Sequence, residues 1–80
     1  MRTTLKEFKT AIETLKHGEM IYINAISCTT KMIDYLRKEI EFGRLIPDEE
    51  TVKAMVKPEA IPSIMSGEII LPQCEYRKVV

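Results

Sequence analysis

One stretch of the sequence combines residue types that could hold a phosphate group. Residues 24–31 read Asn-Ala-Ile-Ser-Cys-Thr-Thr-Lys, which brings three hydroxyl groups and a lysine close together in the chain. If a strand precedes this stretch and a helix follows it, unpaired backbone amides and the positive end of the helix dipole both favour an anion there. We therefore consider a nucleotide or another small phosphorylated molecule as a candidate ligand. The candidate ligand-binding residues are Tyr22, Asn24, Ser27, Thr29, Thr30 and Lys31.

The same stretch has a simpler interpretation. A serine or threonine just before a helix accepts hydrogen bonds from the first helical amides, so Ser27 or Thr29 can serve as the helix cap. The stretch contains no glycine that would let the backbone wrap around a phosphate, and the chain has no Walker or dinucleotide-binding pattern. The residues favour capping over ligand binding.

Other groups that could do chemistry are few and scattered. A nucleophile pair of Cys28 and His17, oriented by Asp34, can be imagined, but nothing in their spacing specifies it. A zinc site needs about four ligands, and this chain offers one histidine and two distant cysteines. We therefore expect no catalytic residue, no metal and no cofactor. Cys28 and Cys74 could form a disulfide, although two free thiols in a reducing cytosol are the preferred interpretation.

The C-terminal segment offers a second kind of candidate site. Residues 74–80, Cys-Glu-Tyr-Arg-Lys-Val-Val, predict an exposed strand that could recognise another protein. The competing interpretation is a solvated edge strand whose charges oppose aggregation. The candidate partner-binding residues are Tyr76, Arg77 and Lys78.

The elements that would position these groups follow from hydrophobic spacing. Apolar residues recur at helical intervals between residues 5 and 15, which predicts an amphipathic helix. Thr3 or Thr4 can cap its start, Glu7 stands where a capping box requires it, and Gly18 provides the stop. The β-branched and aromatic residues 20–23 then predict a strand.

A second helix is predicted over residues 30–42, ended by Gly43. Its apolar residues fill one half of the helical wheel, and Glu39 is the exception because it projects from that half. We favour an edge position at which the Glu39 carboxylate stays wet. The alternative is a buried carboxylate paired with Arg37, Arg44 or a partner subunit.

The rest of the chain predicts two short helices and two strands. Residues 47–50, Pro-Asp-Glu-Glu, resemble a helix start, and Pro58 ends that helix. Residues 58–65 predict another short turn of helix. Strands are expected over residues 68–71 and 74–80, separated by a break at residues 72–73.

These elements predict a small α+β fold. Residues 1–80 are expected to form a single domain in which three to four helices pack on a two- or three-stranded antiparallel sheet. So small a domain has a thin core, and short strands leave exposed edges. Both points favour a homo-oligomer, whose subunit number the sequence does not give.

The amino-acid composition argues against several classes of function. Twelve basic residues balance twelve acidic ones, which argues against a protein that binds nucleic acid by neutralising phosphates. No apolar stretch approaches the roughly 20 residues of a membrane span, and the N-terminal residues lack a signal-peptide core. We expect a cytoplasmic protein with no membrane contact.

Three functions remain as hypotheses. The first is a small non-enzymatic interaction protein, an adaptor or inhibitor of bacterial or phage origin, that acts as a homo-oligomer on a protein partner. The second is a protein that binds or sequesters a small phosphorylated ligand through residues 27–31. The third is a winged-helix-like DNA-binding regulator, which the order of elements allows but which would place the acids of residues 48–50 against DNA phosphates.

Overall fold

Short strands alternate with helices along the chain. The computed structural model describes residues 3–80, and within that range the chain forms four α-helices, two short 3-10 turns and three strands. The elements are α1 (Leu5–Glu13), β1 (Met20–Asn24), η1 (Ala25–Ser27), α2 (Thr30–Glu41), β2 (Leu45–Pro47), α3 (Glu49–Met55), η2 (Pro58–Ala60), α4 (Ile61–Met65) and β3 (Gln73–Lys78). No helix in residues 3–80 is both long enough and apolar enough to cross a bilayer.

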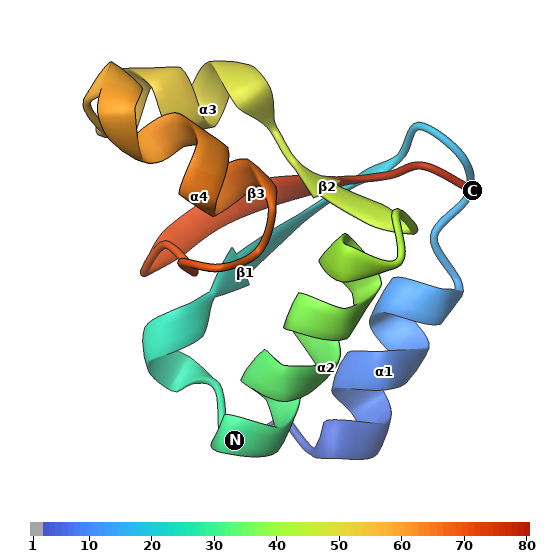
Figure 1. The fold of residues 1–80 in the computed structure, drawn as a ribbon. Helices are drawn as coiled ribbons and strands as arrows, with labels where there is room; N and C mark the ends of the chain where they lie inside the picture. Colours follow the sequence, from blue (N-terminus) through green and yellow to red (C-terminus); the bar gives the residue numbers. More distant parts are fainter. Residues whose placement is uncertain (1–2) are drawn as a thin grey trace.

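The strands form one antiparallel sheet with the last strand in its centre (Figure 1). β3 pairs with β1 on one side and with β2 on the other, so the order is β1-β3-β2. Arg77 of β3 lies opposite both Met20 of β1 and Ile46 of β2. Because β3 separates them, β1 and β2 are the two edge strands of the described sheet.

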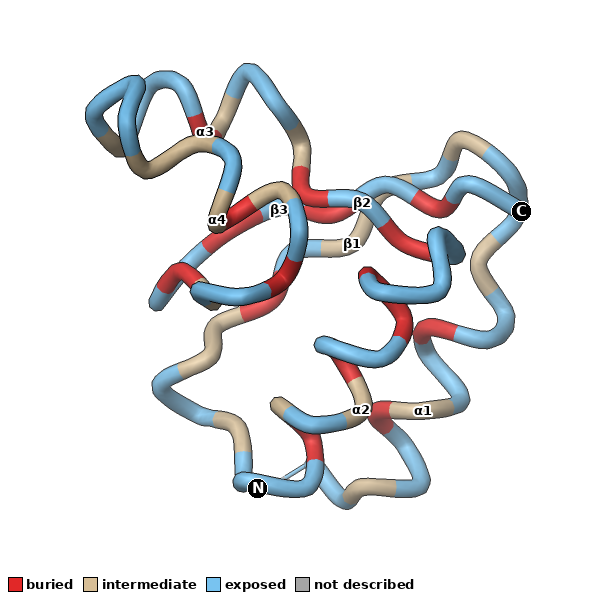
Figure 2. Tube along the Cα trace, viewed as in Figure 1, coloured by how far each residue is buried: buried red, intermediate tan, exposed pale blue. Residues whose placement is uncertain are grey.

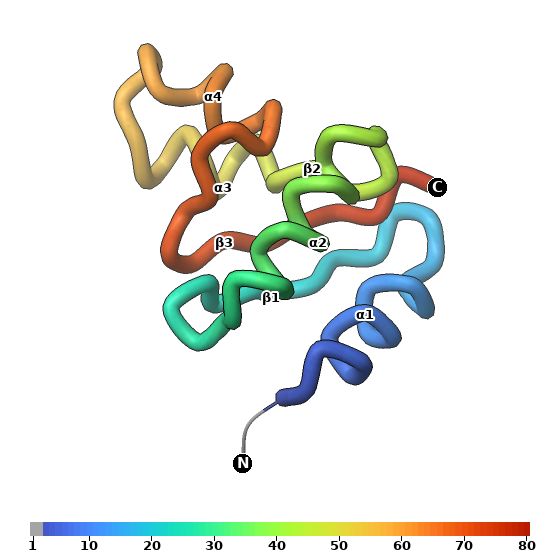
Figure 3. The backbone as a smooth tube through the Cα atoms, turned by 60° about the horizontal axis from the view of Figure 1, so that its bottom comes forward, coloured from blue at the N-terminus to red at the C-terminus, as the bar shows by residue number. Residues whose placement is uncertain are grey.

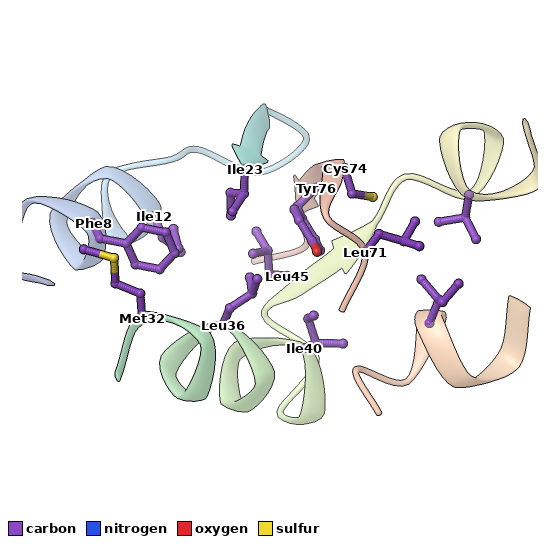
Figure 4. Packing of buried hydrophobic residues seen from close by; sticks show 12 residues of the cluster. Phe8, Ile12, Ile23, Met32, Leu36, Ile40, Leu45, Leu71, Cys74 and Tyr76 are labelled. Atoms are coloured by element: carbon purple, nitrogen blue, oxygen red, sulfur yellow. The ribbon is translucent and has the colours of Figure 1, made fainter. Parts of the chain in front are cut away.

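Helices α1 and α2 lie together on one face of the sheet, while α3 and α4 lie near β2 (Figures 1 and 3). In Figure 4, Tyr76, Ile23 and Leu45 project from the three strands toward the layer that holds Leu36. The buried apolar side chains are Phe8, Ile12, Ile23, Met32, Leu36, Ile40, Leu45, Val52, Ile64, Leu71, Cys74 and Tyr76. The fold is therefore a small α+β arrangement with its core between the helices and one sheet face.

The second face of the sheet carries no helix in the described part of the chain. Along β3, side chains alternate between buried and exposed, as the two-residue period of a strand requires (Figure 2). Cys74, Tyr76 and Lys78 point toward the helices, whereas Gln73, Glu75 and Arg77 are exposed. The sheet is therefore packed on one side and open on the other.

The first half of the chain forms the elements that its sequence predicts, except that α1 ends at Glu13 with Thr14 as its C-cap and not at Gly18. Thr4 caps α1 in a capping box with Glu7, because the Thr4 hydroxyl accepts from the Glu7 amide and the Glu7 carboxylate accepts from the Thr4 amide. β1 and α2 occupy almost the predicted ranges. Gly43 has a positive φ of 73°, which glycine adopts without steric cost, and the chain reverses there after α2.

The second half differs from the prediction in its strands. Residues 68–71 were expected to form a strand, and they instead form a turn and loop in which the Ile69 amide donates to the Ser63 carbonyl. The sheet instead uses β2, a three-residue strand after Gly43 that the sequence analysis missed. No strand pair forms around Pro72, so the element order on which the winged-helix hypothesis relied is wrong.

The start of the third helix is also shifted. Pro47 was expected in its first turn, but Pro47 is the last residue of β2 and Asp48 is the N-cap of α3. The Asp48 carboxylate accepts from the Thr51 amide at 3.2 Å and from the Thr51 hydroxyl at 2.8 Å. Asp48 therefore fixes the direction in which the chain leaves the sheet.

Candidate functional site

The uncovered side of the sheet presents two rows of side chains, which we call the outer face. Its members are Met20, Tyr22, Ile46, Asp48, Glu75 and Arg77. In the first row, Arg77 lies between Met20 and Ile46 across all three strands. In the second row, Glu75 lies opposite Tyr22, and the Asp48 amide donates to the Glu75 carbonyl at 2.8 Å.

The Arg77 guanidinium makes three contacts in the middle of the outer face. Its Nη1 donates to the Gly18 carbonyl at 3.1 Å, and its Nη2 lies 3.3 Å from the Met20 sulfur and 3.7 Å from the Asp48 carboxylate. Ile46, its neighbour on β2, is 39% exposed, and Tyr22 in the next row is 56% exposed. The outer face thus combines one fixed cation with apolar side chains that meet solvent.

Asp48 supplies the negative charge at the border of this face. The hydrogen bonds from the Thr51 hydroxyl and amide, together with the nearby Arg77 guanidinium, lower the pKa of Asp48 below its ordinary value. The carboxylate therefore stays ionised at neutral pH and keeps its attraction for Arg77.

A groove runs beside β1 between that strand and α1, and we call it the edge groove. Phe8 and Ala11 of α1, residues 21–24 of β1, and Cys28 and Met32 line most of it, with a volume of about 320 Å³. Among residues 3–80, the polar side chains that line the groove carry hydroxyl, amide or thiol groups, and no charged side chain from that range lines it.

A second groove lies between α1 and α2 and is basic, and we call it the lysine groove. Lys9, Lys31 and Lys38 line it together with Leu5, Asp34 and Tyr35, around a volume of about 270 Å³. The Lys9 ammonium lies 5.4 Å from the centre of the Tyr35 ring, within cation–π range. Three ammonium groups and one carboxylate give this groove a net positive charge.

The predicted ligand-binding residues do not converge on one point. Tyr22, Asn24 and Ser27 line the edge groove, whereas Lys31 lines the lysine groove. The Thr29 hydroxyl accepts from the Met32 amide at 3.3 Å and caps α2, so this hydroxyl has the structural role that the simpler interpretation gave it. Thr30 is the exposed first residue of that helix.

The predicted partner-binding residues also separate. Tyr76 and Lys78 were expected to lie on an exposed strand, but they are only 1% and 8% exposed, and this part of the prediction is wrong. The Lys78 ammonium donates to the Ile12 carbonyl at 3.1 Å, near the C-terminus of α1, where the helix dipole favours a cation. Only Arg77 of the three reaches the surface.

Glu39 occupies the less favoured of the two predicted environments. It was expected at a wet edge, but it is 6% exposed and its carboxylate accepts from the Arg44 Nε at 2.5 Å. The Arg44 guanidinium also lies over the exposed ring of Phe42, at 5.0 Å. A buried carboxylate needs such a partner, and the turn at Gly43 brings Arg44 back to supply it.

The groups of the imagined nucleophile pair lie at opposite ends of β1. His17 precedes the strand and its Nδ1 donates to the Val79 carbonyl at 2.5 Å, whereas Cys28 follows the strand and contacts the Asn24 carbonyl. Cys28 and Cys74 are both free thiols, and burial raises the pKa of each. Within residues 3–80, no three histidine, cysteine or acidic side chains gather closely enough to hold a metal ion.

Several residues of these surfaces were not found from the sequence. The sequence predicts no role in binding for Met20, Ile46, Lys9 or Lys38. Strand alternation could have placed Met20 with Tyr22 on one face. Ile46 could not be placed, because its strand was not recognised.

Comparisons with known proteins add no further constraint. No protein-family model, no curated protein and no solved structure matches this chain.

Proposed function

We propose that this chain is a small non-enzymatic interaction protein, an adaptor or inhibitor, that binds a protein partner through its outer face. The observation that carries the proposal is the one-sided packing of the sheet. Antiparallel sheets of soluble proteins usually present polar side chains on an open face. Here the open face places exposed Tyr22 and Ile46 around a fixed Arg77.

The composition of the outer face supports this proposal. Tyrosine, methionine and arginine are the residue types enriched in the centres of protein interfaces, where arginine and aromatic side chains often dominate the binding energy. Arg77 is already held by Gly18 and Asp48, so binding a partner would cost little of its side-chain entropy. Self-association remains part of the proposal, because a small domain with a thin core gains buried area from it.

The test compares two variants of the immobilised protein in capture from a bacterial lysate, followed by mass spectrometry. The variant Ile46→Lys places an ammonium group on the outer face, at a residue that does not line the edge groove. The control variant Met55→Lys makes the same type of change at an exposed apolar residue of α3, away from that face. We expect Met55→Lys to retain the wild-type partner and Ile46→Lys to lose it. Retention of the same protein by both variants would exclude the outer face as the binding surface.

A second candidate function is binding of a phosphorylated small molecule, and the lysine groove favours it. Three lysines around one groove form a site for a multiply charged anion. Thermal unfolding with ATP or tripolyphosphate in the millimolar range tests this idea. We expect the double variant K31A/K38A to lose a ligand-dependent rise in Tm that the control Lys53→Ala on α3 keeps. If no anion raises the Tm of the wild-type protein at physiological salt, this candidate is excluded.

A further inference from the structure

The two edges of the sheet differ in how many backbone groups they leave unpaired. The Lys78 amide donates to the Glu19 carbonyl and the Ala25 amide donates to the Pro72 carbonyl. Hydrogen bonding alternates along an antiparallel strand, so Ile21 and Ile23 also point their backbone groups toward β3. The amides and carbonyls of Met20, Tyr22 and Asn24 consequently point outward from the free edge of β1, in the direction away from β3. Of these, the Asn24 carbonyl is engaged within residues 3–80, because Asn24 is the N-cap of η1 and the Cys28 thiol lies 3.5 Å from its carbonyl oxygen.

The opposite edge is closed by its sequence. The Arg44 carbonyl accepts from Val79 and the Asp48 amide donates to Glu75, so Leu45 and Pro47 point their backbone groups outward from β2. Proline has no amide hydrogen, and the strand has only three residues. Proline and short length are two of the means by which proteins prevent an edge from pairing. β1 has neither, and none of its five residues is charged.

The space beside β1 is shaped for an extended segment. In Figure 3, α1 lies beyond β1 on the side away from β3, so the helix layer extends past the edge of the sheet. The edge groove fills this region, and its apolar lining is formed by Phe8, Ala11, Ile21 and Met32. A strand placed next to β1 would point every second side chain into that lining.

We propose that β1 accepts a fourth strand, supplied by an extended, uncharged segment of a partner protein with apolar residues at alternate positions. The inference rests on the proposed role in protein binding and assigns it a surface separate from the centre of the outer face. The chemistry of the occupant follows from the lining, because a charged side chain buried there would find no counterion among residues 3–80. Backbone hydrogen bonds to Met20, Tyr22 and Asn24 supply affinity that depends little on the partner's sequence.

Because that affinity depends little on sequence, a generic peptide is a valid probe. We would titrate ¹⁵N-labelled protein with an acetylated and amidated peptide of alternating threonine and valine, with one lysine at each end for solubility. We expect saturable shifts of the Met20, Tyr22 and Asn24 amides and slower hydrogen exchange at Tyr22. No shift with the peptide in the millimolar range would overturn the proposal.

Two pairs of variants separate backbone pairing from other effects. Tyr22→Pro removes an amide hydrogen that makes no bond within the fold and should weaken peptide binding by about tenfold, whereas Tyr22→Thr keeps that hydrogen and should bind normally. If Tyr22→Pro does not fold, Ala11→Glu places a charge in the groove on an exposed helix position, with Thr10→Glu as its control. Equal binding by Ala11→Glu and Thr10→Glu would refute the edge groove as the binding site.

Two further outcomes show which of the two proposals fails. If dilution of the protein alone shifts the β1 amides, a second copy of the chain occupies the edge, and the assignment to a foreign segment is wrong. If the peptide binds while Ile46→Lys still captures the lysate partner, the outer-face proposal fails and the edge proposal stands.

Discussion

Asp48 provides the sharpest test of how the fold supports its outer face. The residue caps α3 through two hydrogen bonds from Thr51, and it also faces Arg77. Replacing it with alanine, Asp48→Ala, removes the cap and the ion pair together. An N-cap contributes about 1 kcal/mol, and an ion pair with a half-exposed partner at 3.7 Å adds no more than about 0.5 kcal/mol.

These contributions convert to a shift in Tm. Unfolding entropy is about 2.1 cal/mol/K per residue, which gives about 170 cal/mol/K for 80 residues. A loss of about 1–1.5 kcal/mol therefore lowers Tm by about 6–9 °C. Thermal unfolding followed by circular dichroism at neutral pH measures this shift. The control Glu49→Ala removes a neighbouring acid whose only ion pair, with Lys53, is exposed, and it should change stability by less than about 0.5 kcal/mol.

The pH dependence gives a second readout of the same carboxylate. The pKa of Asp48 is lower in the folded protein than its unfolded value of about 3.9. Its stabilisation is therefore complete above that value and disappears as the pH falls through the folded pKa. Asp48→Asn keeps a neutral cap, so the stability difference between wild type and Asp48→Asn should shrink toward acid pH. Equal effects of Asp48→Ala and Glu49→Ala, or a pH-independent difference, would refute this account of α3.

Three further predictions concern buried groups. Lys78→Met keeps the buried stem but loses the charged donor to α1, and urea unfolding should show a loss of about 1–2 kcal/mol. Arg44→Leu leaves the Glu39 carboxylate buried without a partner and should cost about 1–3 kcal/mol, and a loss no larger than that of an exposed lysine-to-leucine change would contradict the pairing. Ellman's reagent at pH 8 should label Cys28 before Cys74 in the native protein and both equally in urea.

The sequence predicted those elements whose signals are local. The helical spacing between residues 5 and 15, the Thr4–Glu7 capping box and the helix over residues 30–42 each depend on neighbours within one or two turns. The strand at residues 20–24 follows from its β-branched content. The α+β class followed from these elements and is confirmed by the sheet and helices of residues 3–80.

The errors arise where a distant segment decides the outcome. Residues 68–71 have strand composition, but the Ile69 amide pairs with the Ser63 carbonyl of α4 and not with a strand. Residues 45–47 have little strand signal and become β2 because β3 offers them an edge. Glu39 is buried because a turn returns Arg44 to it, and no helical wheel contains that information.

The C-terminal strand shows which part of the site could be predicted from the sequence. Strand alternation alone places Tyr76 with Cys74 on one face and Arg77 with Glu75 on the other, so treating Tyr76 and Arg77 as one exposed set ignored the period of the strand. Lys78 also follows this alternation and is buried on the face of Cys74 and Tyr76 although its side chain is charged. It can be buried because its ammonium donates to the Ile12 carbonyl near the end of α1. That interaction depends on a contact between the two ends of the chain and has no local signal.

The central position of β3 explains why the two proposed surfaces can be tested separately. The outer face draws its rows from all three strands, so it exists only when β3 pairs with both neighbours. The edge groove uses the other side of β1, which β3 does not touch, together with α1. A change in the core of β3 therefore disturbs both surfaces, whereas Ala11→Glu acts on the groove alone and a change at Ile46 acts on the outer face alone. A variant that loses one binding activity and keeps the other has therefore changed one binding surface. Its loss of binding cannot be attributed to unfolding.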